Sequence, residues 1–463
     1  MNIIYDFETS TSDFLGQILS FAFVVTDDQL NIIDTWKGTV KLNRTQIADP
    51  GAILTNKLNI DTLNESGKTE YDTAKFIQSQ LDKIIATHGE ATLIGFNSNQ
   101  FDLQFLRNTL LRYGLNPYFK GKLHNIDVLH WIQSLAFENE EVYPWTTQTN
   151  DLNLPYYSFK LEATAKAFGV LKQDQSHDAE EDVLLLIDLI KEIQNQFGQK
   201  LSEFSPISVP NSVYKYEHVV IGKQKVRHFP KSEDDELSYF HYRYWLGLDI
   251  QGKAKLMLDL EAFEKLPESP SPEQLIGTLK YINDNKHMFR LEPLNYQEEV
   301  YFGNIINQAA NAPFIKGINL ENYFKLTEKD WDIEYQIHQL GFERIDTLHA
   351  AVSQIIRDPE AYDKIINRLW SGKKTQKDRY LVQLFNRAYL ALHPSPKPEH
   401  LAKYMAPRYL TGTMMRDPKQ FVDIDQKIKE TQDLLQKAEH PQKDLDNLNA
   451  LLKDMQAKRN LIP

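Results

Sequence analysis

The chain has 463 residues, of which 41% are hydrophobic and 25% charged, and its formal net charge is −12. This is the composition of an ordinary soluble protein with about three domains. The absence of cysteine excludes disulfides, cysteine–zinc sites and thiol catalysis. With no long apolar run and no basic leader, we expect a cytoplasmic protein without a membrane span. The acidic charge does not exclude a nucleic acid held in a local groove.

Strand and helix patterns alternate over residues 1–200 and predict an α/β domain with a mixed sheet. Strands are expected at 3–9, 18–25, 32–40 and 92–97, and helices at 71–88, 101–113 and 179–197. A cluster of Ser and Pro over 201–210 is typical of a linker.

Beyond the linker the composition changes twice. Residues 213 to about 302 are rich in β-forming residues and predict a small barrel or sheet. Helical patterns resume near 327, and the tail over 417–460 resembles a helical hairpin broken near Pro441. We therefore expect three domains, at 1–200, 201–325 and 326–463.

Asp6 and Glu8 lie two residues apart on the first expected strand, so their side chains point to the same face. Two adjacent carboxylates repel each other, and a cation between them relieves that repulsion. An acidic strand face exposed to solvent is the alternative.

Asp102 follows an apolar strand and a polar turn and falls in the first turn of the next expected helix. Aspartate is favoured there for capping and for its interaction with the helix dipole, so a structural role is the alternative to metal binding.

The segment from Ser176 to Asp182 leads into the expected helix 179–197. Asp178 and Glu181 have the spacing of a capping box. This places His177 just before the helix and Asp182 about one turn inside it, so both could reach a cleft at the helix start. Capping or surface exposure is the alternative for His177.

Together these residues resemble the DEDDh (DnaQ-like) exonuclease superfamily. Asp6 and Glu8 match its first motif, Asp102 its second, and His177 with Asp182 its third. Residues 93–108 and 158–182, with Asp49-Pro50-Gly51-Ala52, further resemble bacterial exonuclease I. One departure is the Ser-Thr-Ser-Asp run at 10–13, where that family commonly has a glycine.

The resemblance implies a ribonuclease H-like nuclease domain, then an SH3-like β module and an all-helical domain. It implies 3′→5′ hydrolysis of single-stranded DNA to 5′-mononucleotides by a two-metal mechanism. Two Mg²⁺ ions, for which Mn²⁺ can substitute, would be held by four carboxylates, and a histidine would be the general base. The metal ligands would be Asp6, Glu8, Asp102 and Asp182, and the base would be His177.

Substrate contacts are expected at Thr9 and in a basic, aromatic stretch that contains Lys223, Lys225 and Arg227. Alternating aromatic residues are equally typical of a barrel core, so these residues are open to both interpretations. The resemblance also implies the acidic tail of a single-stranded-DNA-binding protein as a partner, and we expect a monomer.

Two other functions are consistent with the same sequence. One is an RNA 3′-trimming or proofreading exonuclease, because these motifs do not reveal the sugar. The other is a non-catalytic single-strand-binding module on the same fold. The complete set of five motif residues argues against this function, because binding alone would not require them.

Overall fold

The structure is a computed structural model. It describes residues 1–204 except 14, 140, 150–154 and 172–177; the strands between 218 and 293 with 262, 265–271, 274 and 277–278; and 337–461 except 338–339, 371–374, 405–423 and 438–439. The chain forms two compact units. The first comprises 1–126, 174–187 and 328–463, and the second comprises 127–173 and 188–327.

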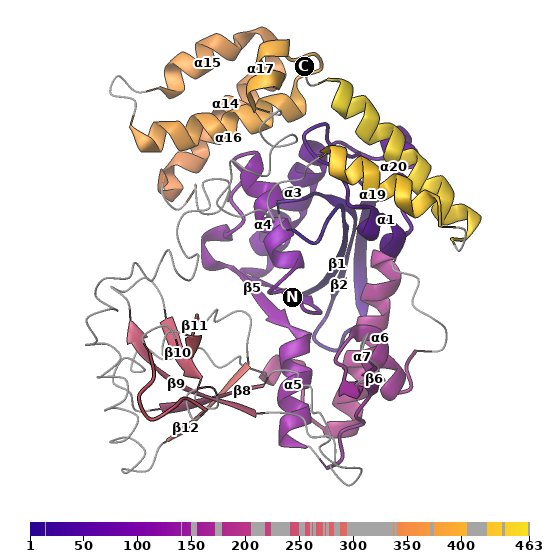
Figure 1. The fold of residues 1–463 in the computed structure, drawn as a ribbon, viewed down its shortest axis with the longest axis vertical. Coiled ribbons are helices and arrows are strands. Elements are labelled where there is room, and N and C mark those ends of the chain that lie inside the picture. The colour runs from indigo at the N-terminus through magenta and orange to yellow at the C-terminus, as the bar shows by residue number, and fades with distance from the viewer. Residues whose placement is uncertain are drawn as a thin grey trace. The chain divides into compact units, whose positions relative to one another are not determined.

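A five-stranded mixed sheet forms the centre of the first unit (Figure 1). Its order is β3-β2-β1-β4-β5, and its strands are β1 (Asn2–Thr9), β2 (Ile18–Thr26), β3 (Ile32–Thr39), β4 (Ala91–Gly95) and β5 (Leu123–Asp127). Strand β1 is antiparallel to β2 and parallel to β4. The expectation of an α/β domain with a mixed sheet is therefore confirmed.

The longer helices of this region agree closely with the sequence prediction. They are α3 (Glu70–His88), α4 (Asp102–Arg112) and α7 (Ala179–Phe197). In α3 the buried side chains recur every three or four residues, at Tyr71, Ala74, Ile77, Leu81 and Ile85, and this apolar stripe fixes the face that packs on the core. Two shorter helices, α1 (Pro50–Asn56) and α2 (Ile60–Ser66), were not predicted.

The second unit contains α5 (Val128–Glu138), α6 (Leu161–Ala167), the short strands β6 (Thr147–Thr149) and β7 (Pro155–Tyr157), and the turn η2 (Leu201–Glu203). Aromatic rings pack here around Tyr143, whose centroid lies 5.7 Å from that of Phe168 and 4.9 Å from that of Trp145.

A second five-stranded sheet, of order β11-β10-β9-β8-β12, also belongs to this unit. Its strands are β8 (His218–Lys223), β9 (His241–Asp249), β10 (Lys255–Asp259), β11 (Leu279–Tyr281) and β12 (Met288–Pro293), paired antiparallel throughout. The β-rich character of this region is confirmed, whereas its SH3-like topology stays a prediction.

The C-terminal residues are helical, as expected. The helices are α14 (Ile345–Arg357), α15 (Tyr362–Leu369), α16 (Gln376–Leu392), α17 (Pro398–Tyr404), α19 (Ile424–Leu435) and α20 (Gln442–Asn460), and the short turns among them are η4 (Phe342–Arg344) and η5 (Pro359–Ala361). A similar short turn, η1 (Phe119–Gly121), precedes β5. The predicted break at Pro441 is confirmed, because Pro441 is the residue that precedes α20. One hydrophobic core runs from β1 into these helices and includes Tyr5, Phe105, Phe385 and Met455.

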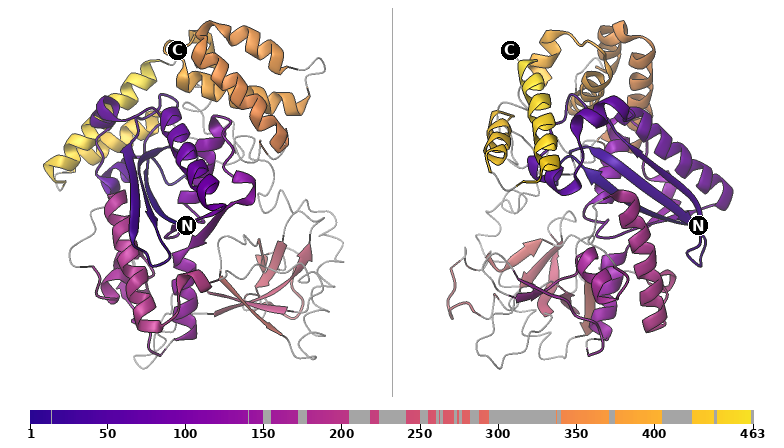
Figure 2. Two further views of the ribbon diagram at one scale, coloured as in Figure 1. Left: turned by 180° about the vertical axis from the view of Figure 1, so that it is seen from behind. Right: turned by 90° about the vertical axis from the view of Figure 1, so that its right-hand side faces the viewer.

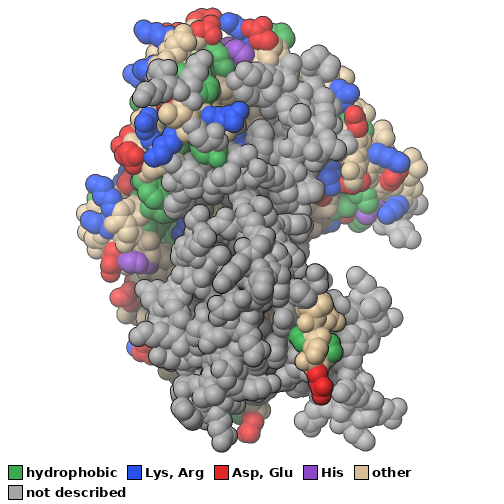
Figure 3. Space-filling model, turned by 60° about the vertical axis from the view of Figure 1, so that its left-hand side comes forward, with side chains coloured by type: hydrophobic (Ala, Val, Ile, Leu, Met, Phe, Trp, Pro, Cys, Tyr) green, Lys and Arg blue, Asp and Glu red, His purple; other side chains and the backbone are tan. Residues whose placement is uncertain are grey.

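Helices α19 and α20 form a hairpin that lies beside α1 (Figure 1, Figure 2). No helix in the described part of the chain is long and apolar enough to cross a membrane. Basic and acidic side chains are interspersed over the described surface of the face in Figure 3, so charge alone marks no nucleic-acid groove on that part of the face.

Candidate metal centre

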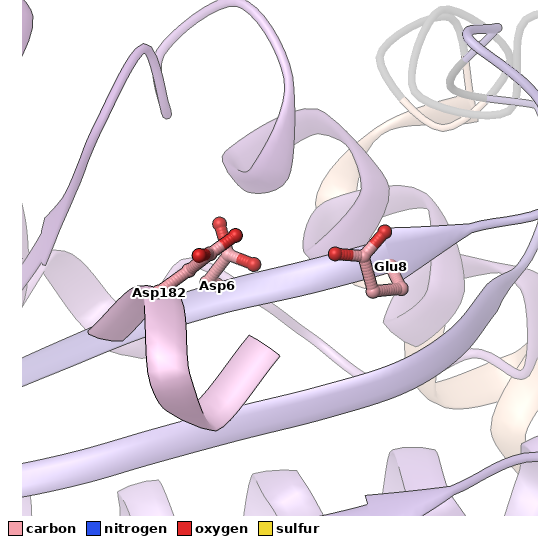
Figure 4. Close-up of side chains that lie close together, drawn as sticks. All are labelled: Asp6, Glu8 and Asp182. Atoms are coloured by element: carbon pink, nitrogen blue, oxygen red, sulfur yellow. The ribbon is translucent and has the colours of Figure 1, made fainter. Parts of the chain in front are cut away.

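Three carboxylates meet at one point of the central sheet. Asp6 and Glu8 extend from the same side of β1, and Asp182 approaches from the first turn of α7 (Figure 4). One oxygen from each of the three carboxylates lies within 4.8 Å of the other two. Side chains from the two ends of the nuclease-like region, on β1 and α7, therefore form a group that could hold a cation.

The start of α7 explains how Asp182 reaches this point. The carboxylate of Asp178 accepts hydrogen bonds from the backbone N–H groups of Glu180 and Glu181, at 3.0 and 3.3 Å, so Asp178 caps the helix as expected. The apolar residues Val183 and Leu186 are buried in the same helix and fix its rotation. Asp182, one turn after the cap, is consequently only 6% exposed.

Asp102 lies at the start of α4 and is also buried, at 3% exposure. Its Oδ1 atom accepts a hydrogen bond of 3.1 Å from the backbone N–H of Phe7, the residue between Asp6 and Glu8. Asp102 thus contacts the strand that carries the first two carboxylates. Among the described residues, the group whose oxygens lie within 4.8 Å of one another comprises Asp6, Glu8 and Asp182.

The electrostatics of the three carboxylates favour a bound cation. Burial, followed by the charges of Asp182 and Asp178, raises the pKa of Asp6 to about 8. Burial, followed by the charges of Asp6, Asp182 and Asp178, raises the pKa of Glu8 to about 9. At neutral pH these groups must either keep protons or share a cation. An all-oxygen donor set suits Mg²⁺ or Mn²⁺, so the residues present fit the expected metals.

The segment that follows Glu8 forms a compact turn. The register between β1 and β2 shifts between Glu8 and Thr9, and Thr9 is 5% exposed. Asp13 holds the later part of this turn with two hydrogen bonds. Its side chain accepts one from the backbone N–H of Leu15, and its carbonyl accepts one from the backbone N–H of Gly16. The glycine expected earlier in this loop is thus replaced by polar residues that bond within the turn.

Several candidate residues are not described at the level of the side chain. His177 lies outside the described residues, as do Lys225 and Arg227. Lys223 is the last residue of β8, and only its place in the strand is described. These assignments stay predictions.

The sequence interpretation missed a buried ion pair that contacts the turn after β1. Arg112 on α4 binds Glu70 on α3, and their side chains are 4% and 2% exposed. The Arg112 guanidinium also donates to the carbonyls of Leu15 and Gly16, at 3.0 Å each. Each residue alone is unremarkable on an amphipathic helix, so no local signal in the sequence reveals the pair.

The mixed sheet, with its carboxylates on β1 and α7, has counterparts among solved structures. Structures of exonuclease I have this fold. The enzyme from Methylocaldum szegediense is 17% identical, with a TM-score of 0.62 over 100% of this chain and 99% of that one. E. coli exonuclease I in complex with a 5cy-dA13 oligonucleotide is 17% identical, with a TM-score of 0.67 over 99% of both chains.

In sequence, the chain is 27% identical over 207 residues to exodeoxyribonuclease I of Buchnera aphidicola subsp. Schizaphis graminum (strain Sg). The match covers 44% of this chain and 41% of that protein, which is less than half the length of the curated relative. No family model matches the chain. The likeness to exonuclease I expected from the motifs is therefore confirmed.

Proposed function

We propose that this protein is a divalent-metal-dependent exonuclease that hydrolyses single-stranded DNA from the 3′ end to 5′-mononucleotides. The observation that carries the proposal is the convergence of Asp6, Glu8 and Asp182 within 4.8 Å, on a fold shared with exonuclease I. Three buried or half-buried carboxylates that repel one another lower the stability of the metal-free protein. A bound cation removes this repulsion, so metal binding explains why the three groups lie together.

Asp6, Glu8, Asp102 and Asp182 are the proposed ligands of two Mg²⁺ or Mn²⁺ ions. When bound, such ions activate a water molecule and stabilise the charge on the attacking and leaving oxygens. Carboxylate oxygens are hard donors, which favour these ions over softer metals. One structure of the E. coli enzyme is a zinc-bound form of its complex with single-stranded DNA, so that protein binds a divalent cation.

His177 is the proposed general base. It lies five residues before Asp182, on the segment that leads into α7, and its imidazole would take the proton from the attacking water. An imidazole suits this role because its ordinary pKa is close to neutral pH. The proposal rests on the position of His177 in the sequence.

DNA contacts are proposed at Thr9, next to the metal ligand Glu8, and at Lys223, Lys225 and Arg227 in the region 201–325. Solved relatives include E. coli exonuclease I with a dA16 oligonucleotide and an ExoI/SSB-Ct complex. By analogy, single-stranded DNA and the acidic tail of a single-stranded-DNA-binding protein are proposed ligands of this chain. A cytoplasmic monomer remains part of the proposal.

Digestion of end-labelled oligonucleotides tests the function. Single-stranded DNA labelled at the 5′ end and at the 3′ end is incubated with Mg²⁺ or EDTA, beside duplex DNA and an RNA of the same sequence. We expect Mg²⁺-dependent release of mononucleotides from the 3′ end of the single-stranded DNA. Asp182→Asn removes the charge of a proposed ligand and keeps its size. This variant is the control for a contaminating nuclease, because activity that remains in it does not come from the proposed site.

Other outcomes select the alternative functions. Cleavage of RNA alone would keep the chemistry and reject the DNA substrate. Binding of single strands without cleavage, in a preparation shown to bind Mn²⁺, would identify a non-catalytic binding module.

A further inference from the structure

The segment that follows Glu8 is held from one side by α1. Thr9 and Ser10 are 5% and 0% exposed. The side-chain amide of Asn56, the last residue of α1, donates a hydrogen bond of 3.1 Å to the carbonyl of Thr9. The backbone N–H of Asp49, which precedes α1, donates 2.7 Å to the carbonyl of Ser10. Two bonds from opposite ends of one short helix therefore fix the backbone next to the proposed metal ligand.

Asn56 is suited to this contact by burial and by geometry. It is 5% exposed, and its side-chain oxygen Oδ1 accepts a hydrogen bond of 3.1 Å from the backbone N–H of Leu58. Both ends of the amide are thus used, which fixes its orientation. The donor meets Thr9 where the register of β1 and β2 shifts.

Helix α1 has seven residues, too few to be stable by itself, so its position depends on tertiary contacts. The hairpin α19–α20 supplies contacts at both of its ends. At the N-terminus, Lys427 Nζ lies 2.9 Å from the carboxylate of Asp49, whose other oxygen accepts from the N–H of Gly51.

At the C-terminus of α1, Lys57 adopts a left-handed conformation with φ of 57°. Its ammonium group lies 2.8 Å from Asp444, and its carbonyl accepts 3.0 Å from the side-chain amide of Asn447. Asn447 is 2% exposed, and its oxygen accepts from Asn59. These are partly buried, directional contacts between segments almost 400 positions apart.

A second route joins the hairpin to the same loop. Lys458 on α20 is 5% exposed and donates 2.8 Å to the carbonyl of Gln46. The side-chain amide of Gln46 donates 3.2 Å to the carbonyl of Leu15, in the turn that begins at Thr9. The hairpin is therefore connected to residues 9–15 through α1 and, independently, through Gln46.

We propose that the C-terminal hairpin is a positioning element for the proposed active site, and that Asn56 is the residue through which it acts on the carbonyl of Thr9. The hairpin holds α1, α1 holds the backbone of Thr9 and Ser10, and that backbone sets the place of the substrate terminus beside Glu8. The inference rests on the proposed exonuclease function for its catalytic consequence, whereas the coupling between hairpin and loop is a property of the protein alone.

Four full-length variants test the proposal. Asn56→Asp keeps the size of the side chain and turns a donor to Thr9 into a charged acceptor. Lys427→Met and Asn447→Leu remove the hairpin contacts to α1 and keep much of the side-chain volume. Lys453→Met, on the same hairpin, is the control, because Lys453 and its partner Asp61 are 73% and 46% exposed.

The variants are compared by steady-state kinetics and by hydrogen exchange. We expect Asn56→Asp to lower kcat/KM for an oligonucleotide by about 10-fold or more, mainly through KM, with the Mg²⁺ half-saturation unchanged. Lys427→Met and Asn447→Leu change kcat/KM in the same direction. Hydrogen exchange in peptides covering residues 9–17 becomes about 10-fold faster in the two hairpin variants. Lys453→Met matches the wild type in both.

If the hairpin only stabilises the protein, the hairpin variants should have lower melting temperatures. Their hydrogen exchange in residues 9–17 and their kcat/KM should then equal those of Lys453→Met. That result overturns the proposal. A wild type that does not hydrolyse DNA contradicts the proposed function instead, and unchanged exchange in residues 9–17 would then still refute the coupling.

Discussion

The carboxylate of Asp102 accepts a hydrogen bond from the backbone N–H of Phe7, the residue that separates Asp6 from Glu8. One side chain from α4 is therefore tied to the strand that carries two carboxylates of the site. This bond gives Asp102 a structural role that is separable from the proposed role in metal binding, because an amide oxygen can accept the same bond without the charge.

Asp102→Asn tests this separation. The variant keeps an acceptor for the Phe7 N–H, so we expect a melting temperature close to that of the wild type. It loses a proposed ligand charge, so hydrolysis should fall by about 10²-fold or more. Asp102→Ala should also lose about 1–3 kcal/mol of stability, because a buried N–H is left without its partner. Thermal melts and initial rates measure the two effects, and full activity in Asp102→Asn would remove it from the ligand set.

Stability of the metal-free protein should decrease as pH rises from about 4 to about 9. The pKa of Asp6 is raised from 3.8 to about 8 and that of Glu8 from 4.5 to about 9. Between those values the folded protein retains protons that the unfolded chain has released, so rising pH favours unfolding. Added Mg²⁺ should stabilise little at pH 5 and progressively more towards pH 9, because cations compete with those protons.

Thermal melts in EDTA and in Mg²⁺ across this pH range provide the measurement. Asp6→Asn is the control, because it removes one titrating group and one repulsive charge. Its metal-free form should depend less steeply on pH and gain less from Mg²⁺. A wild type whose metal-free stability rises between pH 5 and pH 8 would contradict this account of the site.

Much of the region around the site could be predicted from sequence, where local signals are strong. Helix α7 begins and ends at the predicted residues, 179 and 197, because a capping aspartate precedes a regular apolar stripe. Asp6 and Glu8 are two residues apart on strand β1, where buried and half-buried positions alternate from Tyr5 to Thr9, and this spacing placed both carboxylates on one side. The same-face argument therefore needed only local information.

Other features could not be predicted in this way, for two physical reasons. Helix α1 has seven residues, which is too short for a periodic apolar pattern, although Asp49 and Pro50 form a helix-start signal. The partner of Asp102 is a backbone N–H 95 positions earlier, and the sequence offered a local capping role instead. Long-range polar contacts depend on packing that no local pattern encodes.

The buried pair of Arg112 and Glu70 should dominate the stability of this part of the protein. Arg112→Leu leaves the Glu70 carboxylate without its cation and removes the guanidinium donor from the carbonyls of Leu15 and Gly16, although Leu15 keeps the bond from the Gln46 amide. We expect a loss of about 3–5 kcal/mol in the free energy of unfolding. Lys453→Met, at an exposed pair, should change it by less than about 1 kcal/mol. Denaturant unfolding of both variants gives the comparison, and similar small losses would show that the pair contributes little.

His177→Ala tests the proposed general base. The variant removes an imidazole and no carboxylate, so metal binding, measured by Mn²⁺ titration, should stay close to that of the wild type. Turnover at saturating substrate should fall by about 10²–10⁴-fold, the usual contribution of a general base. The rate should also lose the rise through neutral pH that deprotonation of an imidazole produces. His124→Ala is the control, because His124 is 55% exposed on β5 and pairs only at the surface with Glu90. Wild-type turnover in His177→Ala would mean that another group accepts the proton and would reject His177 as the general base.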